Sequence, residues 1–373
     1  MVNNQGVKMK KLRNIMFVFL LLTAIFFVTI GLLFKHYSSP VGGGSENIKV
    51  EISGNGTQIA ETLKKADLIR STTFFKVYLK LFNVKDLKAG KYDLNKEMSL
   101  KEIVDKLKEG NHFSEDEITI TFKEGITMRG VATVIASNTN NTEEDVMNLL
   151  KDQEYLKGLI NDYWFITDKI LDSKIYYSLE GYLFPDTYRF VSKDVTVKEI
   201  FDKLIKQMDT VLTPYKETIE RGKYSAHEIL TLASIVEKEV TKNEEYRKNA
   251  ASVFFNRMKR NMSLGSDVTA YYALKIDNAQ TYIKEKCGGR NCINYQVASP
   301  YNTRLTDGSM NGKLPIGPIS TISEGSIKAV LNHPDTDYIY FISNIKTGEM
   351  FFYTNAREFE AKKAELSKIN GGL

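Results

Sequence analysis

The chain has 373 residues, of which 42% are hydrophobic and 26% charged, a balance typical of a folded protein rather than a disordered one. Lys8, Lys10, Lys11 and Arg13 precede the first apolar segment, and the rest of the chain has 47 basic against 46 acidic residues. The formal net charge of +5 therefore comes mostly from the N-terminal end, and we do not expect a protein that binds nucleic acid.

The first predicted element is a transmembrane helix at residues 15–34, a run without a charged residue. At about 1.5 Å per residue its length is sufficient to cross a hydrocarbon core of ~30 Å. The basic residues before it predict that residues 1–14 stay in the cytoplasm and that the rest of the chain is extracellular. A cleaved signal peptide is the alternative, but no small-residue cleavage site follows Phe34, so an uncleaved single-pass anchor is favoured. Residues 35–46, with three consecutive glycines, predict a flexible spacer.

Residues 47–117 predict a small α+β domain. Ile48–Ile52 alternates like a strand, and residues 57–68 have helical periodicity. The same strand, turn and helix recur at 118–122 and 127–136, and between them lie the segment 87–94 and a helix at 99–109. Such a module is more often a binding or spacing element than a catalytic one.

A helix is predicted at residues 225–240, and it is apolar at most positions. Ser225 and Glu228 form the pattern of a capping box at its start. Glu237 and Glu239 are carboxylates in apolar surroundings, where burial raises the pKa and suits a general acid near neutral pH. Two positions on a helix are about 200° apart, so only one of the two can face a given cleft.

The faces of this helix favour Glu239 over Glu237 as the catalytic acid. Glu237 shares the broader apolar face, which we expect to pack on the core, whereas Glu239 lies on a thinner and mixed face. For Glu237 we expect a structural acid paired with an arginine such as Arg247 or Arg257, or a residue that supports the catalytic one.

The cysteines and histidines give no metal-binding pattern. Cys287 and Cys292 are the only cysteines, and an extracellular location permits a disulfide between them. The four histidines are scattered, and His227 lacks the second histidine of a zinc-protease helix. We therefore expect neither a metal nor another cofactor.

Several segments, taken in order, resemble the MltG/YceG family of membrane-anchored endolytic murein transglycosylases. Residues 56–110 are similar to the LysM-like subdomain of that family, which implies a LysM-like subdomain at 47–117 and an α+β catalytic domain at 118–373. The helix segment LTLASIVEKEV matches the catalytic helix of the family and assigns the acid to Glu239. The other matching segments are LEGYLFPDTYRF (179–190), AASVFFNRM (250–258), SPYNT (299–303), LPIGP (314–318) and SIKAVLNHPDTDYIYF (326–341).

The resemblance implies lytic transglycosylase chemistry, in which one carboxyl group is sufficient. The acid protonates the glycosidic oxygen between N-acetylmuramic acid and N-acetylglucosamine and then, as a base, helps the muramoyl C6 hydroxyl attack the anomeric carbon. The product is a 1,6-anhydro sugar, so strand elongation ends there. Polar side chains must hold the distorted sugar. The candidates are Tyr301, Asn302, Thr303, Ser266 and Asp267, followed by Glu180 and Tyr182.

Each candidate has a structural alternative. The Tyr301 to Thr303 segment can be a turn before a strand, and Asp267 can cap the helix that follows Val268. The neighbours of Glu180 and Tyr182 are expected to pack the core. Residues 338–353 predict a β-hairpin whose aromatic residues are also core.

Two other functions compete with the transglycosylase. One is a non-catalytic cell-wall binding or scaffold protein, and the other is a two-carboxylate hydrolytic muramidase with Asp267 or Glu180 as its second acid. The resemblance also implies peptidoglycan synthases and division proteins as partners.

Overall fold

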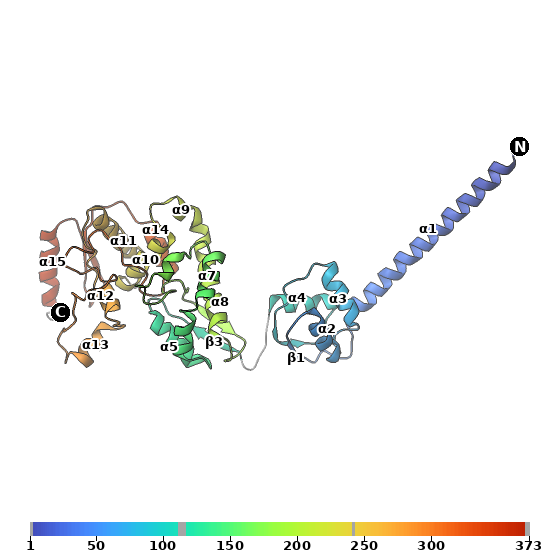
Figure 1. Ribbon diagram of the computed structural model, residues 1–373, viewed down its shortest axis with the longest axis horizontal. Coiled ribbons are helices and arrows are strands. Elements are labelled where there is room, and N and C mark those ends of the chain that lie inside the picture. The colour runs from blue at the N-terminus through green and yellow to red at the C-terminus, as the bar shows by residue number, and fades with distance from the viewer. Residues whose placement is uncertain (1–2, 111–116, 241–242, 370–373) are drawn as a thin grey trace. The chain divides into compact units, whose positions relative to one another are not determined.

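The computed structural model describes residues 3–110, 117–240 and 243–369, and the chain forms two compact units, Met1–Glu117 and Ile118–Leu373 (Figure 1). Both units mix helices with short antiparallel strands, which confirms the α+β class expected from the sequence. Each unit has its own hydrophobic core, formed by a separate cluster of buried side chains.

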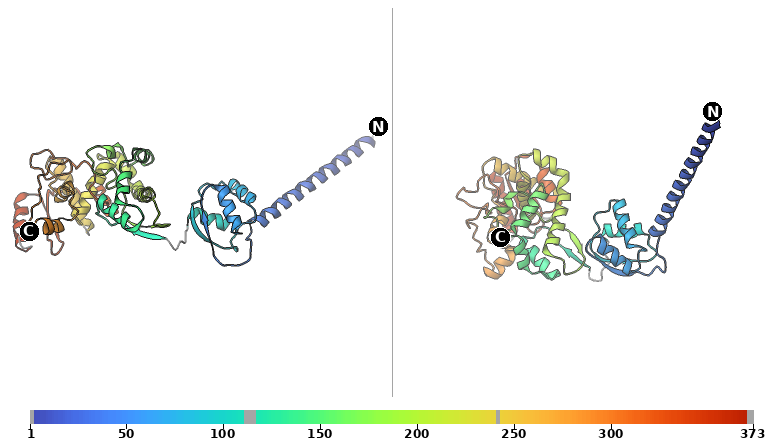
Figure 2. Two further views of the ribbon diagram at one scale, coloured as in Figure 1. Left: turned by 60° about the horizontal axis from the view of Figure 1, so that its bottom comes forward. Right: turned by 45° about the vertical axis from the view of Figure 1, so that its right-hand side comes forward.

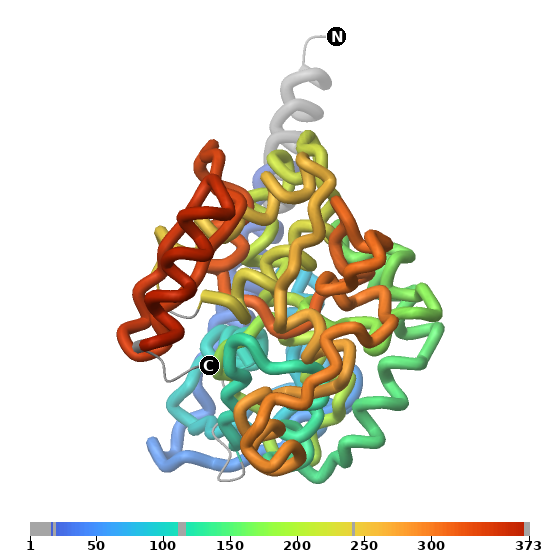
Figure 3. The backbone as a smooth tube through the Cα atoms, turned by 90° about the vertical axis from the view of Figure 1, so that its left-hand side faces the viewer, coloured from blue at the N-terminus to red at the C-terminus, as the bar shows by residue number. Residues whose placement is uncertain are grey.

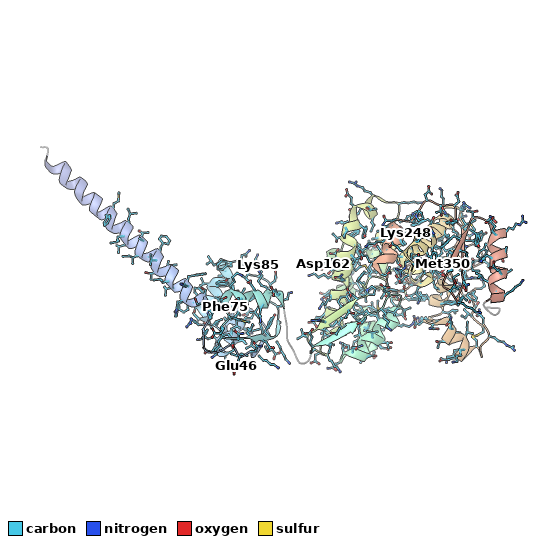
Figure 4. The ribbon with its side chains drawn as sticks, turned by 180° about the vertical axis from the view of Figure 1, so that it is seen from behind. Glu46, Phe75, Lys85, Asp162, Lys248 and Met350 are labelled. Atoms are coloured by element: carbon cyan, nitrogen blue, oxygen red, sulfur yellow. A yellow bond between two sulfur atoms is a disulfide. The ribbon has the colours of Figure 1, made fainter. Side chains whose placement is uncertain are left out.

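The smaller unit packs three helices on a two-stranded sheet. In the sheet, β1 and β2 are antiparallel, with Ile48 opposite Leu94. Phe75 is fully buried in the core of the unit, and Figure 4 shows it among the side chains of the interior. Capping boxes at the starts of α2 and α4 fix where these helices begin. The elements are α1 (Asn3–Ser38), β1 (Ile48–Ile52), α2 (Gly56–Lys65), α3 (Thr72–Leu81), β2 (Gly90–Leu94) and α4 (Leu100–Glu109).

Helix α1 leaves the smaller unit as one continuous helix (Figure 2). Its segment Leu20–Ser38 is long and apolar enough to cross a membrane, and it is the one such segment in the described residues. This segment overlaps the predicted span at 15–34. Most of its large apolar side chains are exposed, which is compatible with a helix that lies in a membrane.

The connection after α1 is hydrogen-bonded to the smaller unit. The side chain of Arg70 donates to the carbonyl oxygens of Pro40 at 2.7 Å and Val41 at 3.2 Å. The amide of Gly42 donates to the carbonyl of Lys96 at 2.9 Å. The segment at 35–46, for which composition predicts a flexible spacer, thus contains the last turn of α1 and a stretch held against the unit.

The larger unit is mainly helical, and its strands form two separate antiparallel pairs. Ile118 of β3 lies opposite Phe190 of β4, and Tyr340 of β5 lies opposite Tyr353 of β6. The second pair confirms the predicted C-terminal hairpin. Figure 3 shows α15 on the outside of this unit.

The strands are β3 (Ile118–Thr121), β4 (Thr187–Phe190), β5 (Tyr340–Ser343) and β6 (Met350–Tyr353). The α-helices are α5 (Met128–Asn138), α6 (Glu143–Leu149), α7 (Gln153–Asp162), α8 (Val197–Leu212), α9 (Lys216–Arg221), α10 (Ala226–Glu239), α11 (Glu244–Lys259), α12 (Asp267–Ala273), α13 (Ala279–Lys286), α14 (Glu324–Leu331) and α15 (Ala356–Ile369), with 3-10 turns at Asp168–Leu171 and Thr213–Tyr215.

Helix α10 is the central helix of the larger unit and contacts α11, α12 and α14 (Figure 1). Ser225 and Glu228 form the predicted capping box at its start. Within the helix only Glu228, Lys238 and Glu239 are not buried, so the helix is largely enclosed, as its mostly apolar sequence indicates. Elsewhere in this unit, Cys287 and Cys292 form a disulfide.

Candidate active site

Glu239 is the last residue of α10, and its side chain is half-buried. Burial raises the pKa of this carboxyl to about 7, and the nearby charge of Asp267 acts in the same direction. The position at a helix C-terminus also disfavours a negative charge, because the carbonyl ends of the helix point there. A carboxyl group of this kind is partly protonated at neutral pH, and the residue remains partly exposed.

Ser266 fixes the orientation of this carboxyl. Its hydroxyl donates a hydrogen bond to Oε1 of Glu239 at 2.5 Å. This bond stabilises the ionised form and lowers the pKa, but it does not cancel the effect of burial. If the hydroxyl keeps this donor role when Glu239 is neutral, the acidic proton lies on Oε2.

Thr303 in turn holds Ser266 in place. The amide of Ser266 donates to Oγ1 of Thr303 at 3.2 Å, and the same Oγ1 lies 2.8 Å from Oγ1 of Thr269. The amide of Gly265 donates to the carbonyl of Thr303 at 3.0 Å. The loop before α12 and the segment around Thr303 therefore form one hydrogen-bonded support for Ser266.

Gly265 is required in this support for two reasons. Its φ of 64° lies in the left-handed region that favours glycine. A Cβ atom at this position would lie 2.9 Å from Nη1 of Arg257, and that nitrogen donates to the carbonyl of Leu264 at 2.5 Å. A side chain at this position would require the guanidinium of Arg257 to shift and would disturb its hydrogen bond to Leu264.

Asp267, Arg304 and Arg257 surround the carboxyl of Glu239 with charge. Asp267 and Arg304 form an ion pair in which both side chains are about two-fifths exposed. Arg304 also lies 5.0 Å from the ring centre of Tyr295. Both arginines lower the pKa of Glu239, in opposition to burial.

Asp267 is the first residue of α12, and Ser266 occupies the N-cap position, so the alternative in which Asp267 caps this helix is wrong.

Glu237 has the surroundings of a structural acid. Its side chain is 4% exposed and pairs with Arg247 at 3.2 Å. It also accepts hydrogen bonds from the amide of Ser323 at 3.0 Å and from the hydroxyl of Ser323. Ser323 is the N-cap of α14, so Glu237 joins α10, α11 and α14. Of the two arginines considered from the sequence, the partner is Arg247.

Tyr301, Asn302 and Thr303 are fully buried. The ring of Tyr301 packs between Tyr176 and Tyr272, with ring centres at 4.7 and 4.8 Å. The amide of Asn302 donates to the carbonyls of Tyr295 and Val297. Tyr301 and Asn302 thus hold the segment that contains Thr303, and Thr303 in turn contacts Ser266. The segment does form a turn, closed by the hydrogen bond from the amide of Asn302 to the carbonyl of Ser299, but α14 and loops follow it in the described chain before β5, so the expected strand after the turn is wrong.

Glu180 and Tyr182 are also buried. Oε2 of Glu180 accepts from the amide of Met128 at 2.9 Å and from the hydroxyl of Tyr272 at 3.0 Å. Its Oε1 has no hydrogen-bond partner among the described residues, and burial raises its pKa to about 7. Tyr272 donates to this carboxyl and packs against Tyr301, so Glu180 is part of the buried core that supports the Tyr301 to Thr303 segment.

Tyr182 is hydrogen-bonded to His227, whose tautomer is set by the carbonyl of Ile316. The imidazole Nε2 lies 2.7 Å from the carbonyl of Ile316 and must donate to it, so Nδ1 accepts from the hydroxyl of Tyr182 at 2.7 Å. Burial lowers the pKa of His227, in agreement with a neutral ring. This pair is a part of the core and not a ligand set.

Arg257, Arg304 and Thr269 belong to the site but are absent from the candidates chosen on sequence. Arg304 directly follows the Tyr301 to Thr303 segment, and this adjacency was a usable signal. Arg257 was considered only as a partner for Glu237, and its contact with the Leu264 carbonyl depends on the fold. A surface hollow of about 720 Å³ between α7 and α8 contains none of these residues, so we do not assign the site to it.

Chemically, the site offers one orientated carboxyl with a pKa near 7 and an exposed ion pair beside it. The second carboxylate nearby, Asp267, is neutralised by Arg304. The arrangement is suited to proton transfer to and from a neutral polar substrate. It provides no second free carboxylate facing Glu239 in the described residues.

Known proteins resemble this chain over most of its length. The YceG-like family profile matches residues 48–365. The endolytic murein transglycosylase of Bacillus subtilis (strain 168) is 34% identical over 327 residues, which cover 87% of this chain and 86% of that protein. The endolytic murein transglycosylase of Streptococcus pneumoniae serotype 2 (strain D39) is 31% identical over 328 residues, and the match covers 85% of this chain but 58% of that longer protein.

A solved structure agrees with these matches. The crystal structure of a YceG-like protein from Listeria monocytogenes superposes with a TM-score of 0.59 at 33% sequence identity, covering 85% of this chain and 99% of that one. This chain belongs to the YceG-like family, and the resemblance inferred from its motifs is confirmed.

Proposed function

We propose that this chain is an endolytic murein transglycosylase whose acid and base are the same residue, Glu239. The observation that carries the proposal is a half-buried carboxyl with a pKa of about 7, orientated by Ser266. The shared name of the relatives from Bacillus subtilis and Streptococcus pneumoniae supports the reaction class and murein as the substrate.

The reaction begins with neutral Glu239. Its proton, on Oε2, passes to the glycosidic oxygen as the bond from that oxygen to the anomeric carbon of N-acetylmuramic acid breaks. The ionised carboxylate then accepts the proton of the C6 hydroxyl while O6 bonds to the anomeric carbon. The bond formed replaces the bond broken, the proton count is restored, and no water enters the product.

Other residues support this carboxyl in the proposal. Asp267 and Arg304, whose side chains are about two-fifths exposed, contact the sugar in this proposal. Ser266 orientates the acid, and Tyr301, Asn302, Thr303, Glu180 and Tyr182 shape the substrate site from within the protein. Glu237 maintains the end of α10 by its bonds to α11 and α14.

We also propose that α1 is a single-pass membrane anchor with a cytoplasmic N-terminus, so that both units are extracellular. The basic residues before the apolar segment support this orientation. The smaller unit is proposed to be a LysM-like module that binds glycan strands near the membrane. Peptidoglycan synthases and division proteins are the partners expected of such an enzyme.

The products formed from peptidoglycan test the proposal. The full chain in vesicles would be incubated with nascent strands and the fragments analysed by mass spectrometry. Anhydro ends support the transglycosylase, hydrated reducing ends support the two-carboxylate muramidase, and binding without cleavage supports a scaffold protein. Glu245→Gln, on the exposed side of α11, is the matched control for Glu239→Gln.

A further inference from the structure

Helix α3 of the smaller unit exposes an unusual group of apolar side chains. Beyond α1, the exposed large hydrophobic residues in the described chain are Val77, Leu81, Phe82 and Ile345. Three of these four lie on α3 or at its C-cap, with exposed fractions of 52, 65 and 53%. A soluble domain of this size usually covers such a cluster or uses it for an interaction.

This group lies beside the end of α1. The ring of Phe34 is 5.4 Å from that of Phe74, 6.3 Å from Tyr78 and 6.2 Å from Phe82. Phe34 lies inside the apolar segment that is able to cross a membrane. Figure 1 shows α3 beside the base of α1. Residues of α3 that touch Phe34 must therefore lie at or near the depth at which the span ends.

The smaller unit is not free to turn away from α1. The connection after α1 is tied to the unit through Arg70 and Gly42, and Phe34 packs against its hydrophobic core. α1 and the unit thus meet through two independent sets of contacts. If α1 is inserted in a bilayer, the exposed face of α3 is kept close to the lipid.

The polar groups around this face suit a lipid surface. The segment 72–88 carries four lysines, Lys76, Lys80, Lys85 and Lys88, and one acid, Asp86. A hollow of about 430 Å³ between α1, α3 and α4 is lined by apolar residues that include Phe34 and Phe82 and by the polar residues Ser38, Ser99, Lys101, Asp105 and Lys108, and its one acid, Asp105, is paired with Lys101. Apolar side chains with lysines around them fit the boundary between acyl chains and anionic headgroups.

We propose that this juxtamembrane face, made of Val77, Leu81 and Phe82 with Phe34, lies in the headgroup region of the bilayer that α1 spans. The occupant of the face is phospholipid, with the apolar side chains reaching the acyl boundary and the lysines meeting anionic headgroups. The smaller unit is then a part of the membrane anchor rather than a module on a free tether. The inference depends on the proposed insertion of α1.

The test places an environment-sensitive NBD fluorophore on single introduced cysteines in the full chain. Leu81→Cys reports on the face, Leu22→Cys on insertion of α1, and Ile345→Cys is the matched control, because it replaces the exposed aliphatic residue of the larger unit. Labelling without reductant spares the native cysteines, which form a disulfide. Each protein is reconstituted in phosphatidylcholine and phosphatidylglycerol vesicles with or without brominated acyl chains.

We expect brominated lipid to quench the label at 22 strongly, the label at 81 clearly, and the label at 345 hardly at all. Quenching at 22 with none at 81 would overturn the lipid-bound face while leaving the anchor intact. No quenching at either position would reject the anchor itself. A label at 81 that is shielded from aqueous iodide but not quenched by brominated lipid would show that protein, such as a second copy, covers the face, and would also overturn the inference. Equal quenching at 81 and 345 would contradict it as well, because the effect would then belong to the fluorophore.

Discussion

The two ends of one short sequence, Glu237 and Glu239, are in very different surroundings although a single residue separates them. Glu237 is enclosed, pairs with Arg247 and accepts two hydrogen bonds from Ser323. Glu239 is half-buried and receives a hydrogen bond from Ser266, with its charged neighbours partly in solvent. A helix turns these two carboxyls to opposite sides, so one belongs to the fold and the other is open to chemistry.

The largest effect is expected from removal of the acid on the open side. Glu239→Gln cannot donate or accept the proton, and general acid–base catalysis contributes about 10²–10⁴-fold, so kcat should fall by about a thousandfold. Release of anhydro ends measures the rate, and thermal unfolding checks that the variant is folded. Glu245→Gln should keep full activity. If Glu239→Gln remained active while folded, the roles assigned to the two carboxyls would be reversed or wrong.

The enclosed carboxyl should affect stability more than chemistry. Glu237→Gln removes the charge that neutralises Arg247, and breaking such a buried pair costs about 3 kcal/mol. Denaturant unfolding measures the loss. Glu244→Gln breaks the exposed pair with Lys248 and should change the free energy of unfolding far less, because water screens that pair. A Glu237→Gln variant as stable as the wild type would contradict the structural role of Glu237.

A third carboxyl, that of Glu180, is buried like that of Glu237 but is not paired with an arginine at close range. Its pKa is raised by burial from 4.5 to about 7, so the folded chain binds more protons than the unfolded chain between these values. Stability therefore falls as pH rises through this window and stays low above it. Glu180→Gln should leave stability unchanged at pH 4 and increase it at pH 8 by up to about 3 kcal/mol.

Unfolding measured at several pH values tests this expectation. A Glu180→Gln variant that is less stable at pH 8 would mean that the ionised carboxylate is needed for the fold. If the variant is stable but yields no cleavage, Glu180 takes part in the reaction, as the two-carboxylate alternative requires.

The smallest effect is expected from Ser266→Ala. The hydroxyl stabilises the ionised form of Glu239, so its loss should raise the pKa of that carboxyl and shift the fall of kcat/KM to higher pH. The rate should decrease by about tenfold because the orientation of the acid is lost. The profile of kcat/KM against pH measures both. A profile that does not move would show that Ser266 has only a structural role.

Sequence alone was sufficient for the parts of the fold that depend on local chemistry. The capping box of Ser225 and Glu228 and the hairpin of β5 and β6 depend on residues close in the chain. The raised pKa of Glu239 could be expected from an enclosed helix. These features follow from periodicity and capping, which operate over a few residues.

The remaining features depend on long-range contacts. Ser266 is 27 residues from Glu239 in the chain, and Thr303 is 37 residues from Ser266, so neither hydrogen bond leaves a local signal. Tyrosine and asparagine occur both inside proteins and at their surfaces, so residue type alone could not predict that Tyr301 and Asn302 are buried. The connection at 35–46 has the composition of a flexible linker, yet Arg70 and Lys96 hold it.

Digestion of peptidoglycan in H₂¹⁸O, followed by mass spectrometry of the new ends, shows directly whether the muramoyl C6 hydroxyl or water attacks the anomeric carbon. Anhydro ends without ¹⁸O are expected from the wild type and should be lost in Glu239→Gln. Reducing ends that carry ¹⁸O would show that water attacks the anomeric carbon and would contradict the claim that one carboxyl serves as both acid and base.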